Sequence, residues 1–221
     1  EWDKFAGAFY TISLDVLMPS MRTLQLGSIH QYKDNFAKPY DIKYETENQD
    51  HTFCHQTTYG MSERILGALI GIHGDNKGLV MPPKVAPTQI VLIPIIFKGK
   101  EKIVLDESYK LYESIKENGF RIKNDKREIN PGNKFYDWEL KGVPLRIEIG
   151  PRDIEKKQVV FVRRDTQEKI FVKKDEILNK LKDTLSDISK NLYKNAKKIL
   201  DENIHRVDTI EKAKNLKGII E

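Results

Sequence analysis

The chain has 221 residues, of which 39% are hydrophobic and 32% are charged, a balance typical of a globular protein rather than a disordered one. Its longest apolar run, Ile90–Phe97, contains Pro94 and is too short to span a membrane. A single cysteine excludes an internal disulfide, so we expect a reducing compartment, the cytoplasm. The net charge of +5 is compatible with a polyanionic partner such as RNA, and equally with an ordinary soluble protein.

Residues 1–55 are rich in β-forming side chains and predict an antiparallel sheet. Four strands are expected, at Phe9–Val16, Arg22–His30, Tyr40–Glu45 and Thr52–Thr57. Regular alternation along the second strand predicts that Ser28 and His30 share one face and that Gln25 lies on the other. A sheet this apolar calls for further partners, and the chain begins without a methionine, so we expect it to be part of a longer protein.

A helix is predicted directly after Gly60, with Ser62 as its N-cap. The helix is apolar on almost every side from Ile65 to Ile72, which is typical of a helix buried in a large core. Arg64 lies in its first turn, where a rigidly held guanidinium suits the recognition of phosphate or carboxylate. The alternative is an arginine whose charged head simply reaches solvent from a buried helix.

Pro82, Pro83 and Pro87 interrupt regular structure and indicate a domain boundary. Beyond them strands and helices alternate, which predicts an α/β domain with a mixed sheet, a terminal hairpin and helices on both faces. We therefore expect domains at residues 1–87, 88–200 and 201–221, the last being only the start of a third domain. Strands are predicted at 89–97, 120–123, 143–149, 159–164 and 169–173, and helices at 103–117, 131–141, 175–203 and 210–216.

Several segments together resemble one family. Gly60 and Glu63-Arg64 before an apolar helix look like motif 3 of the class II aminoacyl-tRNA synthetases. Thr23–His30 (TLQLGSIH) and Asn35–Lys38 (NFAK) are similar to the amino-acid-binding strand and loop of the prolyl-tRNA synthetases. His73–Pro87 resembles that family's exit from its catalytic domain, and Gly132–Asp153 resembles its anticodon-binding domain. The likeness runs over about residues 1–200 and fits the archaeal/eukaryotic-type branch best.

The resemblance implies a fold that joins half of a class II antiparallel-sheet catalytic domain to an α/β anticodon-binding domain. It implies a proline–tRNA ligase that uses ATP and Mg²⁺ to convert L-proline to prolyl-adenylate and then charges the 3′ end of tRNA(Pro). Such a reaction requires in-line positioning and neutralised phosphate charge rather than a dedicated side-chain base. Motifs 1 and 2 are missing from the chain, so we expect the isolated fragment to be inactive.

The resemblance also assigns site residues in the first domain. Arg64 is expected to be the catalytic residue and to bind ATP together with Gln25 and Thr58. Ser28 and His30 are expected to line the proline pocket, with Ser28 standing where threonine is commoner in the family. The alternative for His30 is a histidine whose hydrogen bonds are satisfied within the core at a strand end.

In the second domain the resemblance implies that Glu139, Arg146, Asp153 and, more loosely, Lys169 read the anticodon bases. Carboxylates accept hydrogen bonds from guanine N1 and N2, an arginine reaches O6 and N7, and splayed single-stranded bases expose these edges. The alternative for Glu139 and Arg146 is a salt bridge at the surface.

Five further polar and aromatic residues lie close by in the sequence. Asp125, Arg127 and Lys134 are expected either to contact phosphate or to be solvated, whereas Phe135 and Trp138 are expected in the core rather than as platforms for bases.

No metal site is expected. His51 and His55 lie on one face of their strand and Cys54 on the other, and no second ligand pair stands at zinc spacing. The cysteines that bind zinc in the C-terminal domain of many relatives are also absent, so zinc is not supported. The full-length protein is expected to be a homodimer without membrane segments. The rival reading is a non-catalytic tRNA-binding or accessory protein that reuses the synthetase fold.

Overall fold

The computed structural model describes residues 4–221, which divide into two compact units. The first comprises Glu1–Gly71 together with Asn203–Glu221, and the second comprises Ile72–Glu202. The expected domain boundary at residues 87/88 lies inside the second unit, and the one at 200/201 lies close to that unit's C-terminal end. Among the described helices, none combines the length and the apolar character needed to cross a bilayer.

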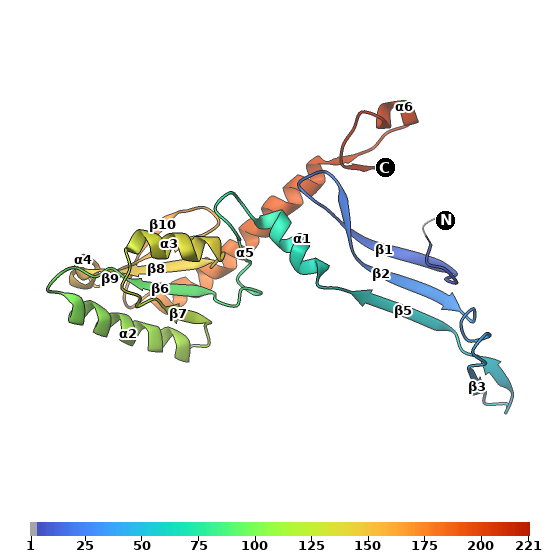
Figure 1. Cartoon of the computed structure of the whole chain (residues 1–221), viewed down its shortest axis with the longest axis horizontal. Coiled ribbons are helices and arrows are strands. Elements are labelled where there is room, and N and C mark those ends of the chain that lie inside the picture. The colour runs from blue at the N-terminus through green and yellow to red at the C-terminus, as the bar shows by residue number, and fades with distance from the viewer. Residues whose placement is uncertain (1–3) are drawn as a thin grey trace. The chain divides into compact units, whose positions relative to one another are not determined.

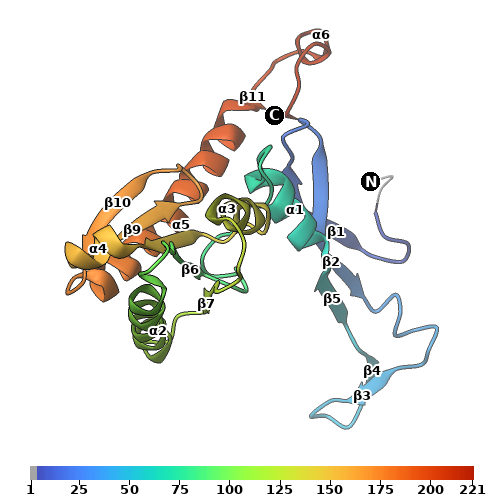
Figure 2. The ribbon, with the colours of Figure 1, turned by 60° about the vertical axis from the view of Figure 1, so that its left-hand side comes forward.

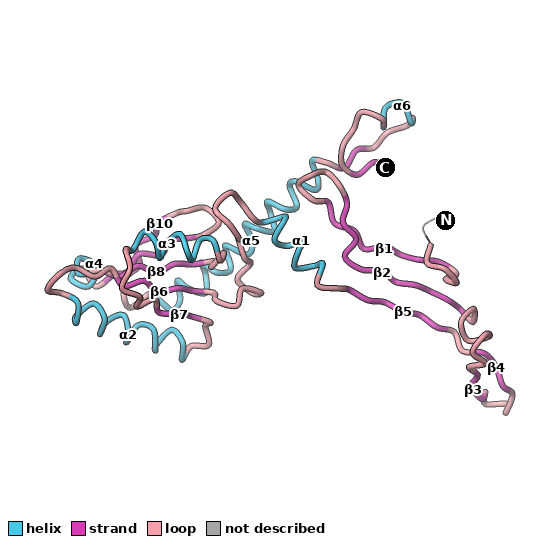
Figure 3. The backbone as a smooth tube through the Cα atoms, in the orientation of Figure 1, coloured by secondary structure: helices cyan, strands magenta, loops and turns pink. Residues whose placement is uncertain are grey.

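The first unit is built on a three-stranded antiparallel sheet of order β1-β2-β5 (Figure 3). Its strands are β1 (Tyr10–Leu17), β2 (Thr23–Lys33) and β5 (Gln56–Met61), and β3 (Lys43–Glu45) pairs separately with β4 (His51–Phe53). The predicted strands are confirmed, although the one predicted at Thr52–Thr57 is divided between β4 and β5. The C-terminal residues of this unit form β11 (Ile204–His205), α6 (Ile210–Ala213) and β12 (Ile219–Ile220).

A β-bulge in β2 changes which side chains share a face. Leu14 of β1 pairs with Gly27, but the next residue, Asp15, pairs with Gln25, so Leu26 is an extra residue in β2. An extra residue shifts the alternation of side chains by one. Gln25 therefore lines the same groove as Ser28, and the prediction of opposite faces is wrong.

Helix α1 (Arg64–His73) begins as predicted, and the Ser62 hydroxyl accepts a hydrogen bond from the Arg64 backbone N–H at 3.3 Å. The prediction that it is buried in a large core is wrong, because Ala68 is the one buried residue along it. Leu66 and Ile70 remain 54% and 42% exposed. Its apolar character is therefore not explained by packing among the described residues.

The second unit contains a mixed five-stranded sheet of order β10-β9-β8-β6-β7 (Figure 1). β6 pairs in parallel with β7 and β8, whereas the β8–β9 and β9–β10 pairs are antiparallel. The strands are β6 (Ile90–Pro94), β7 (Ile122–Asn124), β8 (Leu145–Ile149), β9 (Gln158–Arg163) and β10 (Lys169–Lys173). The helices are α2 (Glu101–Glu117), α3 (Pro131–Leu140), α4 (Pro151–Glu155) and α5 (Ile177–Glu202). The predicted mixed sheet and terminal hairpin are confirmed, and α4 was not predicted.

Alternate residues of β6 point into two different hydrophobic layers, as the strand's period of two requires. Ile90 and Leu92 belong to the larger core, to which α2 and α5 contribute. Val91 and Ile93 pack against Phe135 and Trp138 of α3 on the opposite face. Figure 2 shows α2, α3 and α5 around the strands of this sheet. The predicted helices on both faces are thus confirmed, and so is the core position of the two aromatic residues.

Candidate functional site

The first unit contains an open groove of about 520 Å³ along β2, β5 and the start of α1. Its lining includes all five residues predicted to bind ATP or proline: Gln25, Ser28, His30, Thr58 and Arg64. Aromatic and apolar side chains also line it, among them those of Phe5, Tyr32, Tyr59 and Met61. The groove therefore combines hydroxyls, one guanidinium and apolar surface.

The imidazole of His30 is held from both sides. Its Nδ1 lies 2.9 Å from Thr11 Oγ1 and its Nε2 lies 2.8 Å from Ser28 Oγ. The ring centroid is 4.7 Å from that of Phe5. Because both ring nitrogens already have hydroxyl partners, the imidazole contributes a fixed ring surface to the groove rather than an unused donor.

Arg64 lies where the groove meets α1. Its Nη1 donates to the backbone oxygen of Gln25 at 3.2 Å, which ties the guanidinium to β2. Within residues 4–221 no carboxylate forms an ion pair with Arg64. A guanidinium has five N–H donors, so most of its donors are available to an anion. Thr58 also lines the groove, and its Oγ1 lies 3.0 Å from Tyr32 Oη.

The second unit contains a cluster around Arg146 on the α3 face of the sheet. The Arg146 guanidinium lies 4.1 Å from the Phe135 ring centroid. Its Nε donates to Glu148 Oε1 at 2.9 Å, and its Nη1 lies 3.5 Å from Glu139 Oε1. These three charged side chains are only 11–13% exposed, so the pairing of Glu139 with Arg146 is not a surface salt bridge.

Glu148 is the member of this cluster that the sequence analysis missed. It stands two residues after Arg146 in β8, so the two side chains share a face, and this spacing was the available signal. Its carboxylate neutralises Arg146 at closer range than Glu139 does. Arg146 therefore has two acceptors that hold it in one orientation.

The other two residues predicted to read bases lie in different settings. Lys169 of β10 and Arg146 of β8 both pair with Val162 of β9, which puts them on one face of the sheet. Asp153 instead caps α4, since its Oδ2 accepts from the Gly150 backbone N–H at 3.0 Å. The structure thus gathers Glu139, Arg146 and Lys169 on one face and gives the Asp153 carboxylate a structural contact of its own.

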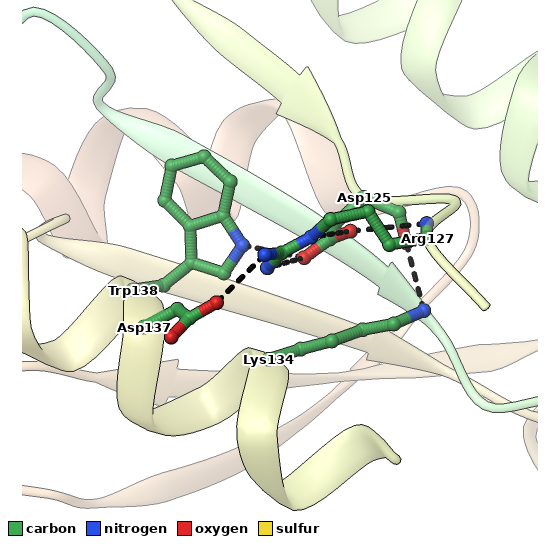
Figure 4. A network of polar contacts seen from close by, with 5 residues as sticks. All are labelled: Asp125, Arg127, Lys134, Asp137 and Trp138. Carbon is green, nitrogen blue, oxygen red and sulfur yellow. Dashed lines mark hydrogen bonds and ion pairs between the residues drawn. The ribbon is translucent and has the colours of Figure 1, made fainter. Parts of the chain in front are cut away.

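A polar network fixes α3 beside the strand end at Asp125 (Figure 4). The Asp125 carboxylate accepts from Arg127 Nε at 2.9 Å, from Arg127 Nη2 at 2.7 Å and from Trp138 Nε1 at 2.7 Å. Arg127 Nη1 also donates to Asp137 at 2.7 Å, and the buried Lys134 donates to the Asp125 backbone oxygen at 3.1 Å. Of the two alternatives for Asp125 and Lys134, contact with phosphate or solvation, the second is wrong, because both side chains are buried and bonded within the fold.

Burial and hydrogen bonding shift the pKa values in this network. Desolvation is the largest influence on Asp125 and would raise its pKa, but the hydrogen bonds from Arg127 and Trp138 together lower it to about 2. Burial lowers the pKa of Lys134. The Asp125 carboxylate is therefore ionised at neutral pH although it is buried.

The loop before β6 is attached to the sheet by Arg164. Its Nη1 and Nη2 donate to the two carboxylate oxygens of Asp75 at 2.7 and 2.6 Å, and its Nε donates to the Glu139 backbone oxygen at 3.1 Å. The hydrogen bonds from Arg164 lower the pKa of Asp75 to about 2. Gly142, at a φ of +69°, allows close contact here, since a Cβ atom would lie 2.6 Å from Leu79 Cβ. This arrangement sets the position of Glu139 at the end of α3.

The groove offers polar groups that suit a nucleotide. The guanidinium of Arg64 and the hydroxyl of Thr58 suit phosphate and ribose oxygens. Among the described residues no group of three or more His, Cys, Asp or Glu side chains lies in position to hold a metal ion. Mg²⁺ is commonly held by one or two carboxylates together with substrate phosphates, so it does not require a site made of protein ligands alone. The side chains that line the groove therefore suit a nucleotide, whose phosphates would supply ligands to Mg²⁺.

The sequence of this chain is similar to the sequences of known proteins. Residues 89–184 match the family model described as "Anticodon binding domain". The chain is 53% identical to a proline–tRNA ligase of Thermococcus kodakarensis and 51% identical to one of Pyrococcus abyssi. Both alignments cover all of this chain and 47% of the relative. A proline–tRNA ligase of Methanocaldococcus jannaschii is 47% identical over 89% of this chain and 43% of the relative. The chain spans about half the length of these relatives. It is thus a homologue of the proline–tRNA ligases and carries an anticodon-binding domain of the class II aminoacyl-tRNA synthetase family.

Proposed function

We propose that this chain forms the motif 3 and anticodon-reading parts of a proline–tRNA ligase. The observation that carries the proposal is the groove of the first unit, which is lined by residues of β2 (Gln25, Ser28, His30), β5 (Thr58) and α1 (Arg64). The proposal implies that ATP, L-proline and tRNA(Pro) are the substrates and that Mg²⁺ is the cofactor. A homodimer and a cytoplasmic location belong to the same proposal.

In the groove, Arg64 would face the phosphates of ATP. Adenylation joins the proline carboxylate to the α-phosphorus and releases pyrophosphate, and positive charge that is positioned in advance stabilises the charge that develops on the phosphate oxygens. The link from Arg64 to the Gln25 backbone limits the motion of the guanidinium, which keeps the cost of reorganisation low. Mg²⁺, when bound, would neutralise further phosphate charge.

Proline would lie against the ring of His30. The hydroxyls of Thr11 and Ser28 fix that ring, and Phe5 packs against it. The pocket therefore has an apolar surface of fixed shape against which an aliphatic ring could pack. Such a pocket rejects larger amino acids by volume but discriminates weakly against cysteine, which is close to proline in size.

In the second unit, Arg146 and Glu139 would read guanine in the anticodon. A guanidinium donates to O6 and N7, and a carboxylate accepts from N1 and N2. The pairing of Arg146 with Glu148 and its packing on Phe135 orient the guanidinium before RNA binds. Lys169 on the same face would contact phosphate or base, and Asp153 would take part only through the start of α4, which it caps.

The ligase reading is tested by proline-dependent exchange of pyrophosphate into ATP, measured on the protein as its gene produces it. Arg64→Ala is expected to abolish detectable exchange, whereas Arg206→Ala, an exposed arginine paired with Glu221, is expected to leave it unchanged. An absence of proline-dependent exchange in the unmodified protein would contradict the ligase reading. It would favour the rival, a tRNA-binding accessory protein, for which binding without exchange is the expected result.

A further inference from the structure

The outer strand of the second unit's sheet carries alternating lysine and aromatic side chains. Lys169, Phe171 and Lys173 occupy every second position of β10 and therefore share one face. The pairings of β10 with β9 and of β9 with β8 put this face on the same side as Arg146 and Glu148. The three side chains thus extend the predicted base-reading face to the edge of the sheet.

Phe171 is exposed on this face. Its side chain is 66% accessible, although phenylalanine on a strand normally packs. The packing of α3 reaches Val91, Ile93 and Val143 and includes no residue of β10. An accessible aromatic ring between two lysines is the arrangement by which proteins stack an unpaired base while contacting the adjacent phosphates.

A lysine-lined groove continues from the end of β10. It has a volume of about 540 Å³ and is lined by Lys156, Lys157, Lys173, Lys174 and Asp175. A backbone hydrogen bond of 2.9 Å from the Lys174 N–H to the Lys157 oxygen holds its two sides together.

The lysines of this groove differ in their partners. Lys174 is neutralised by Glu107 at 2.6 Å. Within the part of the chain that the structure describes, Lys156, Lys157 and Lys173 form no ion pair with a carboxylate. These three exposed lysines outnumber the carboxylate of Asp175, which also lines the groove, and the remaining positive charge favours a polyanion that runs along the strand edge.

We propose that this edge binds a single-stranded segment of RNA, with Phe171 stacked on an unpaired base and Lys156, Lys157 and Lys173 in contact with the phosphates beside it. Lys169 and Lys173 are four residues apart, about 13 Å along a strand, which leaves room for a base on the ring between two phosphate contacts. The inference rests on the proposed anticodon reading, because it extends the same face to nucleotides next to the one that Arg146 would recognise.

The test measures binding of the whole 221-residue chain to a proline tRNA transcript over a series of salt concentrations. Phe171→Ala is expected to weaken binding by about 5- to 150-fold, the range found for loss of one base-stacking contact. Phe171→Trp is expected to restore it, because indole also stacks. Tyr193→Ala, which removes an exposed aromatic residue from α5, is the matched control and is expected to bind like the unmodified chain.

The phosphate contacts are tested by charge removal. Lys173→Gln is expected to reduce the salt slope of log K by about 0.7, as loss of one phosphate contact to a single strand would. Lys182→Gln removes an exposed lysine of α5 and is the control. Unchanged affinity in Phe171→Ala together with an unchanged slope in Lys173→Gln would overturn the inference. The lysines would then serve to protect an edge strand from pairing with other chains.

The inference and the proposed function can fail separately. If Arg146→Ala relaxes the preference for the native anticodon while Phe171→Ala binds normally, this inference alone is wrong. If the chain shows no anticodon preference but loses affinity on substitution of Phe171 and Lys173, the edge binds RNA and the anticodon reading is wrong. Absence of RNA binding by the unmodified chain, even at low salt, would overturn both.

Discussion

The buried carboxylate of Asp125 allows a quantitative prediction about how α3 is held on the sheet. Asp125→Asn keeps the size of the side chain but replaces one acceptor oxygen by an NH₂ group that faces N–H donors of Arg127 or Trp138. The carboxylate is 1% exposed and its pKa falls from 3.8 to about 2, which corresponds to about 2 kcal/mol at about 1.36 kcal/mol per pKa unit. We therefore expect the substitution to lower the free energy of unfolding by about 2 kcal/mol at neutral pH.

The pH dependence has a defined sign. Because the pKa of Asp125 is lower in the folded chain than in the unfolded one, the stabilisation is complete above about pH 4 and disappears as the pH falls toward 2. Urea unfolding of the second unit, followed by circular dichroism, measures both variants. Asp137→Asn, whose carboxylate is 44% exposed, is the control and should cost less than about 1 kcal/mol. Equal costs for the two variants, or a cost for Asp125→Asn that does not change with pH, would refute the reasoning.

Three further outcomes are expected. Gly142→Ala places a Cβ against the neighbouring loop at a positive φ and should lower the free energy of unfolding of the second unit by about 1–3 kcal/mol in urea unfolding. Gly119→Ala is the control: its φ is also positive but its Cβ would lie in open space, so it should cost about 1 kcal/mol. Arg164→Met should cost about 2 kcal/mol by the same measurement, because it removes two of the donors to the Asp75 carboxylate and the side-chain donor to the Glu139 backbone oxygen. Ser28→Ala, which frees one nitrogen of the adjacent imidazole, should raise KM for proline by about 2- to 10-fold in pyrophosphate exchange with little change in KM for ATP. Equal changes in both KM values would contradict this assignment.

The larger elements could be predicted because local patterns determine them. β10 was predicted with its observed bounds, Lys169–Lys173, since a turn precedes it and β-forming residues fill it. α5 follows from a long amphipathic pattern that buries Ile177, Leu181 and Ile188 on one side. α4 was missed because its five residues are too few to show a helical period.

The sites were harder to predict, because they depend on features that have no local pattern. The five residues of the groove were named from the family resemblance, but the bulge at Leu26 that brings Gln25 beside Ser28 interrupts the alternation and cannot be read from it. The buried Asp125 carboxylate is bonded to Arg127, two residues away, and to Trp138 of α3, 13 residues away, which the tertiary fold brings to the same carboxylate. Glu148 and Phe171, in contrast, follow from the period of a strand once its neighbours are known.

We propose that the second unit reads the anticodon of proline tRNA. The most direct measurement compares the affinity of the 221-residue chain for transcribed proline tRNA with its affinity for a copy in which both anticodon guanines are replaced, at one stated salt concentration. Arg146→Ala is measured alongside.

We predict that the unmodified chain prefers the native anticodon and that Arg146→Ala loses about 1–3 kcal/mol of this preference. Equal affinity of the unmodified chain for the two RNAs would contradict the claim, and the base-reading roles of Glu139, Arg146 and Lys169 would then have to be withdrawn.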